Sequence, residues 1–231
     1  MFWIDYWYIV LVLPAVLFAM WAQFRVNSTF NKYSRVATRA GITGYQSARM
    51  VLDAHGLSHV SIEEARGGHL SDHFDPRANV IRLSREVYHG QSAAAIGVAA
   101  HEAGHAVQYA EGYVPMKLRS AIIPATNIGS NLAFPLILMG LLFSYPPLAY
   151  AGVIAFSLST VFQLVTLPVE FNASRRAMAA IGGSGRFSAE EERGARRVLS
   201  AAALTYVAAL AVSLANLLRL LLMVRGNDRR R

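Results

Sequence analysis

Four long apolar stretches constrain the fold of this chain more than any other feature of its sequence. They cover residues 3–24, 121–143, 148–168 and 199–224. A helix needs about 20 apolar residues to cross the hydrocarbon core of a bilayer, and each stretch is long enough. Charged residues make up only 16% of the chain, below the quarter or so that soluble domains carry, as lipid-facing surfaces require. The pattern predicts about four transmembrane helices.

The first apolar stretch has two interpretations, a cleaved signal peptide or an uncleaved anchor. No basic residue precedes it, and no small-residue cleavage site is clear at its end. Trp and Tyr near its start, with Trp21 near its end, match the aromatic belts of transmembrane helices. We therefore interpret residues 1–24 as a transmembrane anchor.

The distribution of lysine and arginine predicts the orientation of the chain. Residues 25–119 contain eleven of them and residues 170–198 contain six, whereas residues 1–24 contain none. Both basic segments are expected on the cytoplasmic side. The basic tail leaves the orientation of the last helix open. The predicted order is a transmembrane anchor (1–24), a cytoplasmic α+β segment (25–118), a transmembrane hairpin (119–168), a second cytoplasmic segment (169–198), and a transmembrane helix with the basic tail (199–231).

The first cytoplasmic segment mixes helical and strand patterns. A helix is expected over residues 34–55, with Gly56 as its stop. Short strands are expected at 60–62, 69–74 and 80–83, the last two forming a hairpin around a turn at 75–79. Ser92 is expected to cap an alanine-rich helix that runs through residues 94–110. The predicted fold class is mainly α, with a small α+β, zincin-like cytoplasmic portion.

That alanine-rich helix contains the run His101-Glu102-Ala-Gly-His105. Residues four apart on a helix lie on one face, so His101 and His105 can present two imidazoles to one ion. Zinc accepts such ligands and lowers the pKa of its bound water, and a neighbouring carboxylate such as Glu102 can accept the proton. The chain has no cysteine, so any zinc ligands must be histidines and carboxylates. The alternative is a helix with two surface histidines and a solvated glutamate.

A catalytic zinc usually has three protein ligands and one open position, so a third ligand is needed. Five other histidines are present, but Glu170 is the better candidate because it lies at the expected cytoplasmic end of the third membrane helix. The alternative for Glu170 is an ion pair with Arg175 or Arg176. The spacing alone leaves both interpretations open.

Two signatures resemble the YugP-type neutral zinc metallopeptidases of bacterial membranes. The first runs from His69 to Gln108 and includes Leu-Ser-Asp-His-Phe-Asp-Pro-Arg and Ala-Ala-His-Glu-Ala-Gly-His-Ala-Val-Gln. The second is Thr-Leu-Pro-Val-Glu-Phe-Asn-Ala-Ser-Arg-Arg-Ala. The resemblance implies a gluzincin-like metalloendopeptidase in which His101, His105 and Glu170 bind Zn²⁺ and Glu102 is the general base.

The second signature is also distantly similar to the Glu-x-x-Ala-Asp stretch of the HtpX-type membrane proteases. Ser174 stands where those proteins have the aspartate that steadies their zinc site. Asn172 and Ser174 are therefore the candidates for orienting the ligands. Peptide hydrolysis also needs a donor for the developing oxyanion. His73, His69, Arg175 and Tyr109 are available, and the sequence does not choose between them.

The predicted function is a membrane-embedded zinc metalloprotease of the cell membrane that cleaves peptide bonds near the cytoplasmic face. Its expected partners are membrane lipids and a peptide or membrane-protein substrate, which could pair with the strand edge of the predicted hairpin. The alternative is a non-catalytic, metal-stabilised membrane assembly or scaffold protein. The net charge of +8 admits a nucleic-acid binder, but the basic residues cluster beside apolar segments, so no nucleic-acid partner is expected.

Overall fold

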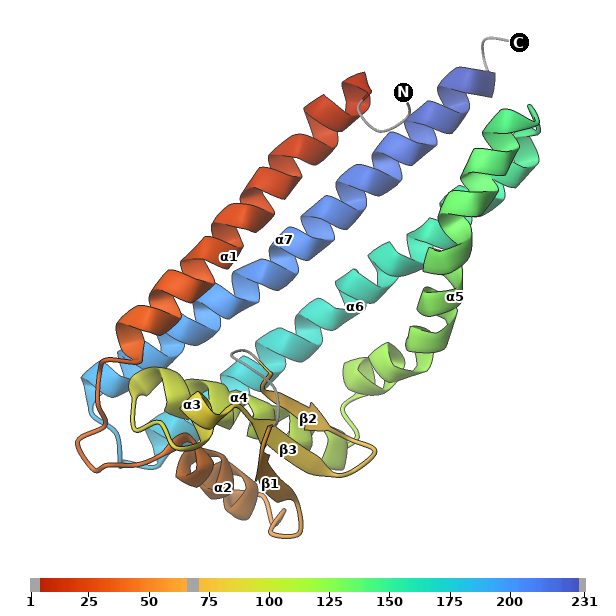
Figure 1. Ribbon diagram of the computed structural model, residues 1–231. Coiled ribbons are helices and arrows are strands. Elements are labelled where there is room, and N and C mark those ends of the chain that lie inside the picture. The colour runs from red at the N-terminus through yellow and green to blue at the C-terminus, as the bar shows by residue number, and fades with distance from the viewer. Residues whose placement is uncertain (1–4, 66–70, 229–231) are drawn as a thin grey trace. The chain divides into compact units, whose positions relative to one another are not determined.

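The computed structural model describes residues 5–65 and 71–228 and confirms a mainly helical fold with a small sheet (Figure 1). A short π-helical turn, η1, leads directly into α1, and the other elements follow in chain order. Their bounds are η1 Tyr8–Val12, α1 Leu13–Tyr33, α2 Gly44–Ala54, β1 Ser61–Glu64, β2 His73–Asp75, β3 Val80–Leu83, α3 Arg85–Tyr88, α4 Ala93–Ala110, α5 Val114–Leu142, α6 Pro146–Gly183 and α7 Ala189–Asp228.

Four of the described helices are long and apolar enough to cross a membrane, as the sequence predicted. They span Tyr8–Tyr33, Val114–Leu142, Pro146–Gly183 and Ala189–Gly226. In the most apolar window of each, at most 22% of the residues are buried inside the chain. Such helices leave most of their apolar side chains exposed, which is the surface that lipid tails cover.

The chain divides into two compact units. The helical unit comprises Met1–Ala22, Lys117–Leu167 and Thr205–Arg231, and the mixed unit comprises Gln23–Met116 and Pro168–Leu204. Within the helical unit, Gly140 and Gly152 allow α5 and α6 to approach closely. A Cβ at either position would lie less than 3.0 Å from atoms of the facing helix. Hydroxyl pairs add polar contacts between helices, Ser130 with Ser159 and Thr160 with Ser213.

The mixed unit contains a three-stranded sheet in the order β1-β3-β2. The expected hairpin is present, since β2 pairs antiparallel with β3 through Phe74 and Ile81. Its first strand was predicted over residues 69–74, whereas β2 covers only His73–Asp75, and residues 69 and 70 lie outside the described residues. The sequence did not predict that β1 pairs parallel with β3. The sheet and helices α2, α4, α6 and α7 share one apolar core, whose fully buried members include Leu52, Ile81, Ile96 and Ile181. This core holds α4, the helix with the histidine motif, beside the sheet.

Several element boundaries differ from those expected. The predicted helix over residues 34–55 is wrong at its start, because α2 begins only at Gly44. There Thr43 and Gln46 form a reciprocal capping box, and Gly41 adopts a φ of 64° just before it. Gly56, with a φ of 70°, ends the helix as predicted. The helix expected to start near Ala94 begins at Ala93, and the Ser92 hydroxyl caps it by accepting from Ala95 N–H.

The first and third membrane helices continue beyond their apolar stretches. Helix α1 extends to Tyr33, and α6 continues through Pro168 to Gly183. Glu170 lies inside a helix rather than in a connecting segment, so its backbone position is fixed by helical geometry.

Candidate metal centre

Helix α4 presents His101 and His105 on one face, one turn apart. Their ring centroids are 4.6 Å apart and the rings are nearly perpendicular. The side chains of both histidines are mostly buried, that of His101 being 13% exposed and that of His105 10% exposed. Alanine and glycine dominate the rest of α4, so the helix can pack against its neighbours on nearly all sides.

Helix α6 brings Glu170 to the two imidazoles. The approach depends on Gly104, because a Cβ at that position would lie 2.7 Å from the carbonyl oxygen of Ala173 on α6. Glu170 is 2% exposed. Its Oε2 atom lies 3.3 Å from Nε2 of His101 and 3.5 Å from Nε2 of His105. The structure therefore brings together the three residues that the sequence proposed as ligands.

The geometry of these three side chains fits a zinc ion. One ligand atom from each residue can be chosen so that all lie within 4.8 Å of one another. Two ligand atoms of a tetrahedral zinc, each about 2.0–2.1 Å from the metal, are roughly 3.4 Å apart. The two distances from Glu170 to the imidazole nitrogens match that separation. Two imidazoles and a carboxylate are also a donor set found in catalytic zinc sites.

Hydrogen bonds hold the other nitrogen of each imidazole. The Nδ1 atom of His101 lies 3.1 Å from the hydroxyl of Ser174, and the Nδ1 atom of His105 lies 3.0 Å from Oε1 of Gln108. The Gln108 amide nitrogen donates elsewhere, to the carbonyl oxygen of Val169 and to Asn172 Oδ1. Its oxygen is therefore left to accept from Nδ1–H of His105. In that tautomer the Nε2 lone pair of His105 is free to bind a metal.

The contacts continue from Gln108 to the end of α4. Asn172 Oδ1 also accepts from Nε of Arg176, and the Arg176 guanidinium pairs with Glu111 at 2.7 Å. The guanidinium lowers the pKa of the Glu111 carboxyl. Gln108 is completely buried. A continuous network therefore joins α4 to α6 and orients His105 relative to Glu170.

Negative charge surrounds the two imidazoles. Burial lowers the pKa of His105, but the Glu170 and Glu102 carboxylates outweigh this effect and raise it. Glu102 is 9% exposed and lies next to His101 in the chain. Burial raises the pKa of Asp72, and the charge of Glu102 adds to the increase. A field that favours a protonated imidazole also favours a bound cation.

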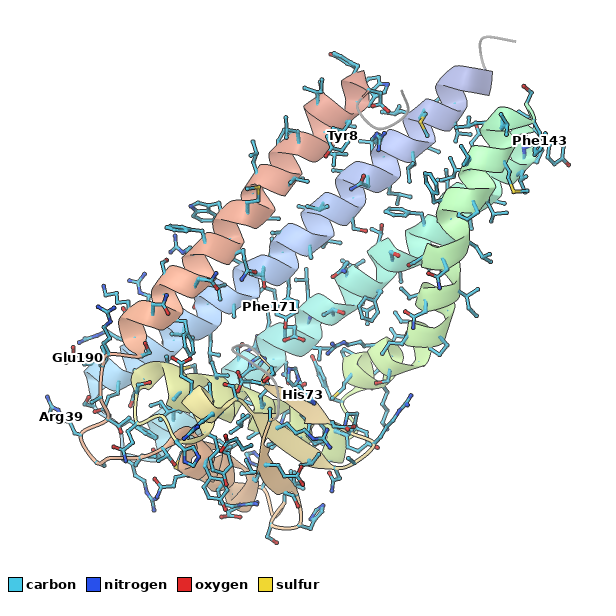
Figure 2. All side chains as sticks on the ribbon, viewed as in Figure 1. Tyr8, Arg39, His73, Phe143, Phe171 and Glu190 are labelled. Carbon is cyan, nitrogen blue, oxygen red and sulfur yellow. The ribbon has the colours of Figure 1, made fainter. Side chains whose placement is uncertain are left out.

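The remaining predicted residues lie in different places. Ser174 contacts His101 directly, and Asn172 reaches His105 through Gln108, so both are positioned for the orienting role proposed for them. Arg175 lines a cavity of about 420 Å³ together with Ser174. His73 lies on β2 and is exposed (Figure 2). Its Nδ1 atom is within hydrogen-bond distance of the carbonyl oxygen of Ser71. His69 lies outside the described residues.

The sequence prediction missed three members of this network. Gln108 had a usable signal, because it follows His105 by three positions on the same helix and can therefore reach its ring. Arg176 was proposed only as an alternative partner of Glu170, whereas its guanidinium binds Glu111 and Asn172. No sequence pattern pairs Glu111 with a residue on α6. That contact exists only because α4 and α6 pack together.

Comparisons with known proteins match the chain to a family of zinc metallopeptidases. The family model described as "Putative neutral zinc metallopeptidase" matches residues 8–225. The chain is 48% identical over 222 residues to the "Putative membrane protease YugP" of Bacillus subtilis (strain 168). The aligned region covers 96% of this chain and 98% of that protein. No solved structure matches the chain.

Proposed function

The chain belongs to the neutral zinc metallopeptidase family, and from that premise we propose that it is a membrane-embedded zinc metalloprotease with Glu102 as its general base. The observation that carries the proposal is the convergence of His101, His105 and Glu170 from two packed helices, with Glu102 beside them. These three residues would hold the zinc. When bound, zinc acts as a Lewis acid that acidifies water and polarises a peptide carbonyl.

The side chains of the protein would transfer the proton, orient the two histidines and stabilise the oxyanion. Glu102 accepts a proton from the attacking water and then donates it to the departing amine nitrogen, so one carboxylate serves both steps. Gln108 and Ser174 keep Nδ1 of the two histidines engaged, which leaves each Nε2 for the metal. His73, Arg175 and Tyr109 remain the described candidates for the oxyanion donor.

We propose peptide bonds of membrane or membrane-proximal proteins as the substrate. Strand β2 is at the end of the described sheet, and it packs against α4. An extended peptide that pairs with the side of β2 that has no partner strand in the described sheet would therefore run beside the helix that carries His101. The excess of arginine and lysine in the mixed unit supports a cytoplasmic position for this site.

Zinc content and cleavage, measured on the same preparations, test this proposal. The purified full-length chain should contain about one zinc per chain and cleave casein or a peptide library. The Glu102→Gln variant should keep its zinc and lose about 10²–10⁴-fold in kcat/KM, the range for a lost general base. Absence of cleavage in the zinc-loaded wild type would instead favour a metal-stabilised assembly protein.

A further inference from the structure

A second site lies in the mixed unit, between the last turns of α1 and the first turns of α7. It is a cavity of about 830 Å³, and none of the metal-centre residues lines it. We call it the basic pocket, because five cationic side chains line it and no carboxylate does. These are Arg25 and Lys32 on α1, and Arg193, Arg196 and Arg197 on α7.

Helical periodicity directs both sets of side chains into this one cavity. Ser28, Thr29 and Lys32 follow Arg25 at three, four and seven positions, which places the four lining residues on one face of α1. On α7, Arg196 and Arg197 follow Arg193 at three and four positions. Like charges so placed on a helix repel one another, and an anion in the cavity would relieve that repulsion.

The two helices are held in register around the basic pocket. A Cβ on Gly194 would lie 2.8 Å from the ring of Tyr33, so the glycine allows α1 and α7 to pack closely. The Glu191 carboxylate accepts from the backbone N–H groups of Arg39 and Ser188, which ties the chain after α1 to the start of α7. Figure 2 shows Arg39 and Glu190 at this end of the two helices.

The three α7 arginines that line the basic pocket have no acidic partner among the described residues. Among residues 5–65 and 71–228, no carboxylate forms a salt bridge with Arg193, Arg196 or Arg197. Glu191, the buried acid of the first turn, is already occupied by backbone donors. Lys32 lies over the ring of Tyr33, with its Nζ 5.5 Å from the centroid. Three of the five cations that line the cavity, all on α7, therefore have no acidic partner among the described residues.

The position of the basic pocket along both helices indicates the kind of anion. Helix α1 is apolar up to Phe24 and then turns basic at Arg25, whereas α7 is charged up to Arg197 and then turns apolar. Both transitions occur at the cavity, where Ala201 and Leu204 add apolar lining. Cations that only flank a membrane helix need no cavity. A cavity with cations, hydroxyls and an apolar wall at the level of the membrane surface suits a lipid headgroup.

We propose that the basic pocket binds the headgroup of an anionic glycerophospholipid. The phosphate diester pairs with the arginines of α7 and with Arg25, and the Thr29 hydroxyl donates to one of its oxygens. The glycerol and the first acyl carbons lie against Leu204. This binding is independent of peptide hydrolysis and of the metal centre.

Native mass spectrometry of the full-length chain in mild detergent tests the proposal. Phosphatidylglycerol is titrated against phosphatidylcholine with identical acyl chains. The wild type should retain one phosphatidylglycerol in preference to phosphatidylcholine. The double variant Arg193→Gln/Arg197→Gln should retain it roughly 10- to 30-fold more weakly, at about fivefold for each cation removed. Millimolar inorganic phosphate should not displace the lipid.

Two further double variants distinguish binding in the basic pocket from a general effect of charge. Arg85→Gln/Arg186→Gln removes the same charge from exposed positions outside the cavity and should retain lipid like the wild type. Arg193→Lys/Arg197→Lys should keep most of the binding, with unchanged thermal unfolding in all variants. Equal retention of both lipids, equal loss in both glutamine variants, or displacement by phosphate would overturn the proposal.

Discussion

The metal centre concentrates lone pairs and negative charge at a buried point, whereas the basic pocket collects cations around an open cavity. At the first site, Glu170 is 2% exposed, and hydrogen bonds fix both imidazoles. At the second, Arg193, Arg196 and Arg197 are exposed and make no salt bridge among the described residues. Both belong to the mixed unit, so the same core supports two sites of opposite electrostatic character.

This difference shows how each site selects its ligand. A buried, oriented set of two nitrogens and one oxygen specifies a metal by geometry, and a small displacement of one ligand weakens it. An exposed group of arginines selects a charged headgroup mainly by electrostatics and tolerates more movement. The metal centre should therefore be sensitive to single substitutions that leave the basic pocket unaffected.

Glu170→Gln should give the largest difference between the two sites, because it should weaken zinc binding and leave lipid binding unchanged. The amide keeps the shape of the side chain but removes its negative charge and the anionic oxygen that a metal prefers. We expect zinc affinity, measured by competition with a chromogenic chelator, to fall by more than the 10–100-fold typical of residues that only orient ligands. Cleavage should be lost at limiting zinc, while phosphatidylglycerol retention stays at the wild-type value.

Glu190→Gln is the matched control, because Glu190 is an exposed carboxylate in the first turn of α7. Its zinc affinity should equal that of the wild type. If Glu170→Gln bound zinc as tightly as this control, Glu170 would not be a ligand.

Gln108→Ala should have an intermediate effect, confined to the metal centre. Its loss frees Nδ1 of His105 and removes the link to Asn172, so the imidazole is no longer held in the metal-binding tautomer. Zinc affinity should fall about 10–100-fold. Gln91→Ala, at an exposed glutamine outside the network, serves as the control. A purely packing role for Gln108 would lower thermal stability without changing zinc affinity measured below the unfolding temperature.

Gly104→Ala should have the smallest effect on zinc and act mainly on stability. The added methyl would lie 2.7 Å from the carbonyl oxygen of Ala173, so α4 and α6 must separate slightly. We expect a loss of about 1–3 kcal/mol in the free energy of unfolding. Gly183→Ala has no atom within 4 Å of the new methyl and should be neutral or slightly stabilising. Equal stabilities would contradict the close approach of the helices.

The sequence predicted the parts of the fold and site that depend on local pattern. Four apolar stretches gave the membrane helices, and the i, i+4 spacing placed His101 and His105 on one helical face. Ser92 was identified as a cap because its effect lies within one turn. The late start of α2 was missed, although the Thr43 and Gln46 capping box was readable.

The remaining features depend on contacts between distant segments. Spacing alone left Glu170 open between a ligand and an ion pair, and its place beside α4 follows from the Gly104 contact with α6. The same contact brings Gln108 to Val169 and Asn172. The arginine count revealed basic flanks, but only the packing of α1 against α7 makes them line one cavity.

The most direct test of the metal centre is a structure of the zinc-loaded chain with anomalous scattering recorded at the zinc edge. The account predicts one peak bounded by Nε2 of His101, Nε2 of His105 and a carboxylate oxygen of Glu170, each about 2.0–2.2 Å away. A zinc bound by the two histidines with the Glu170 carboxylate beyond coordination reach, or bound elsewhere in the chain, would contradict the three-ligand site.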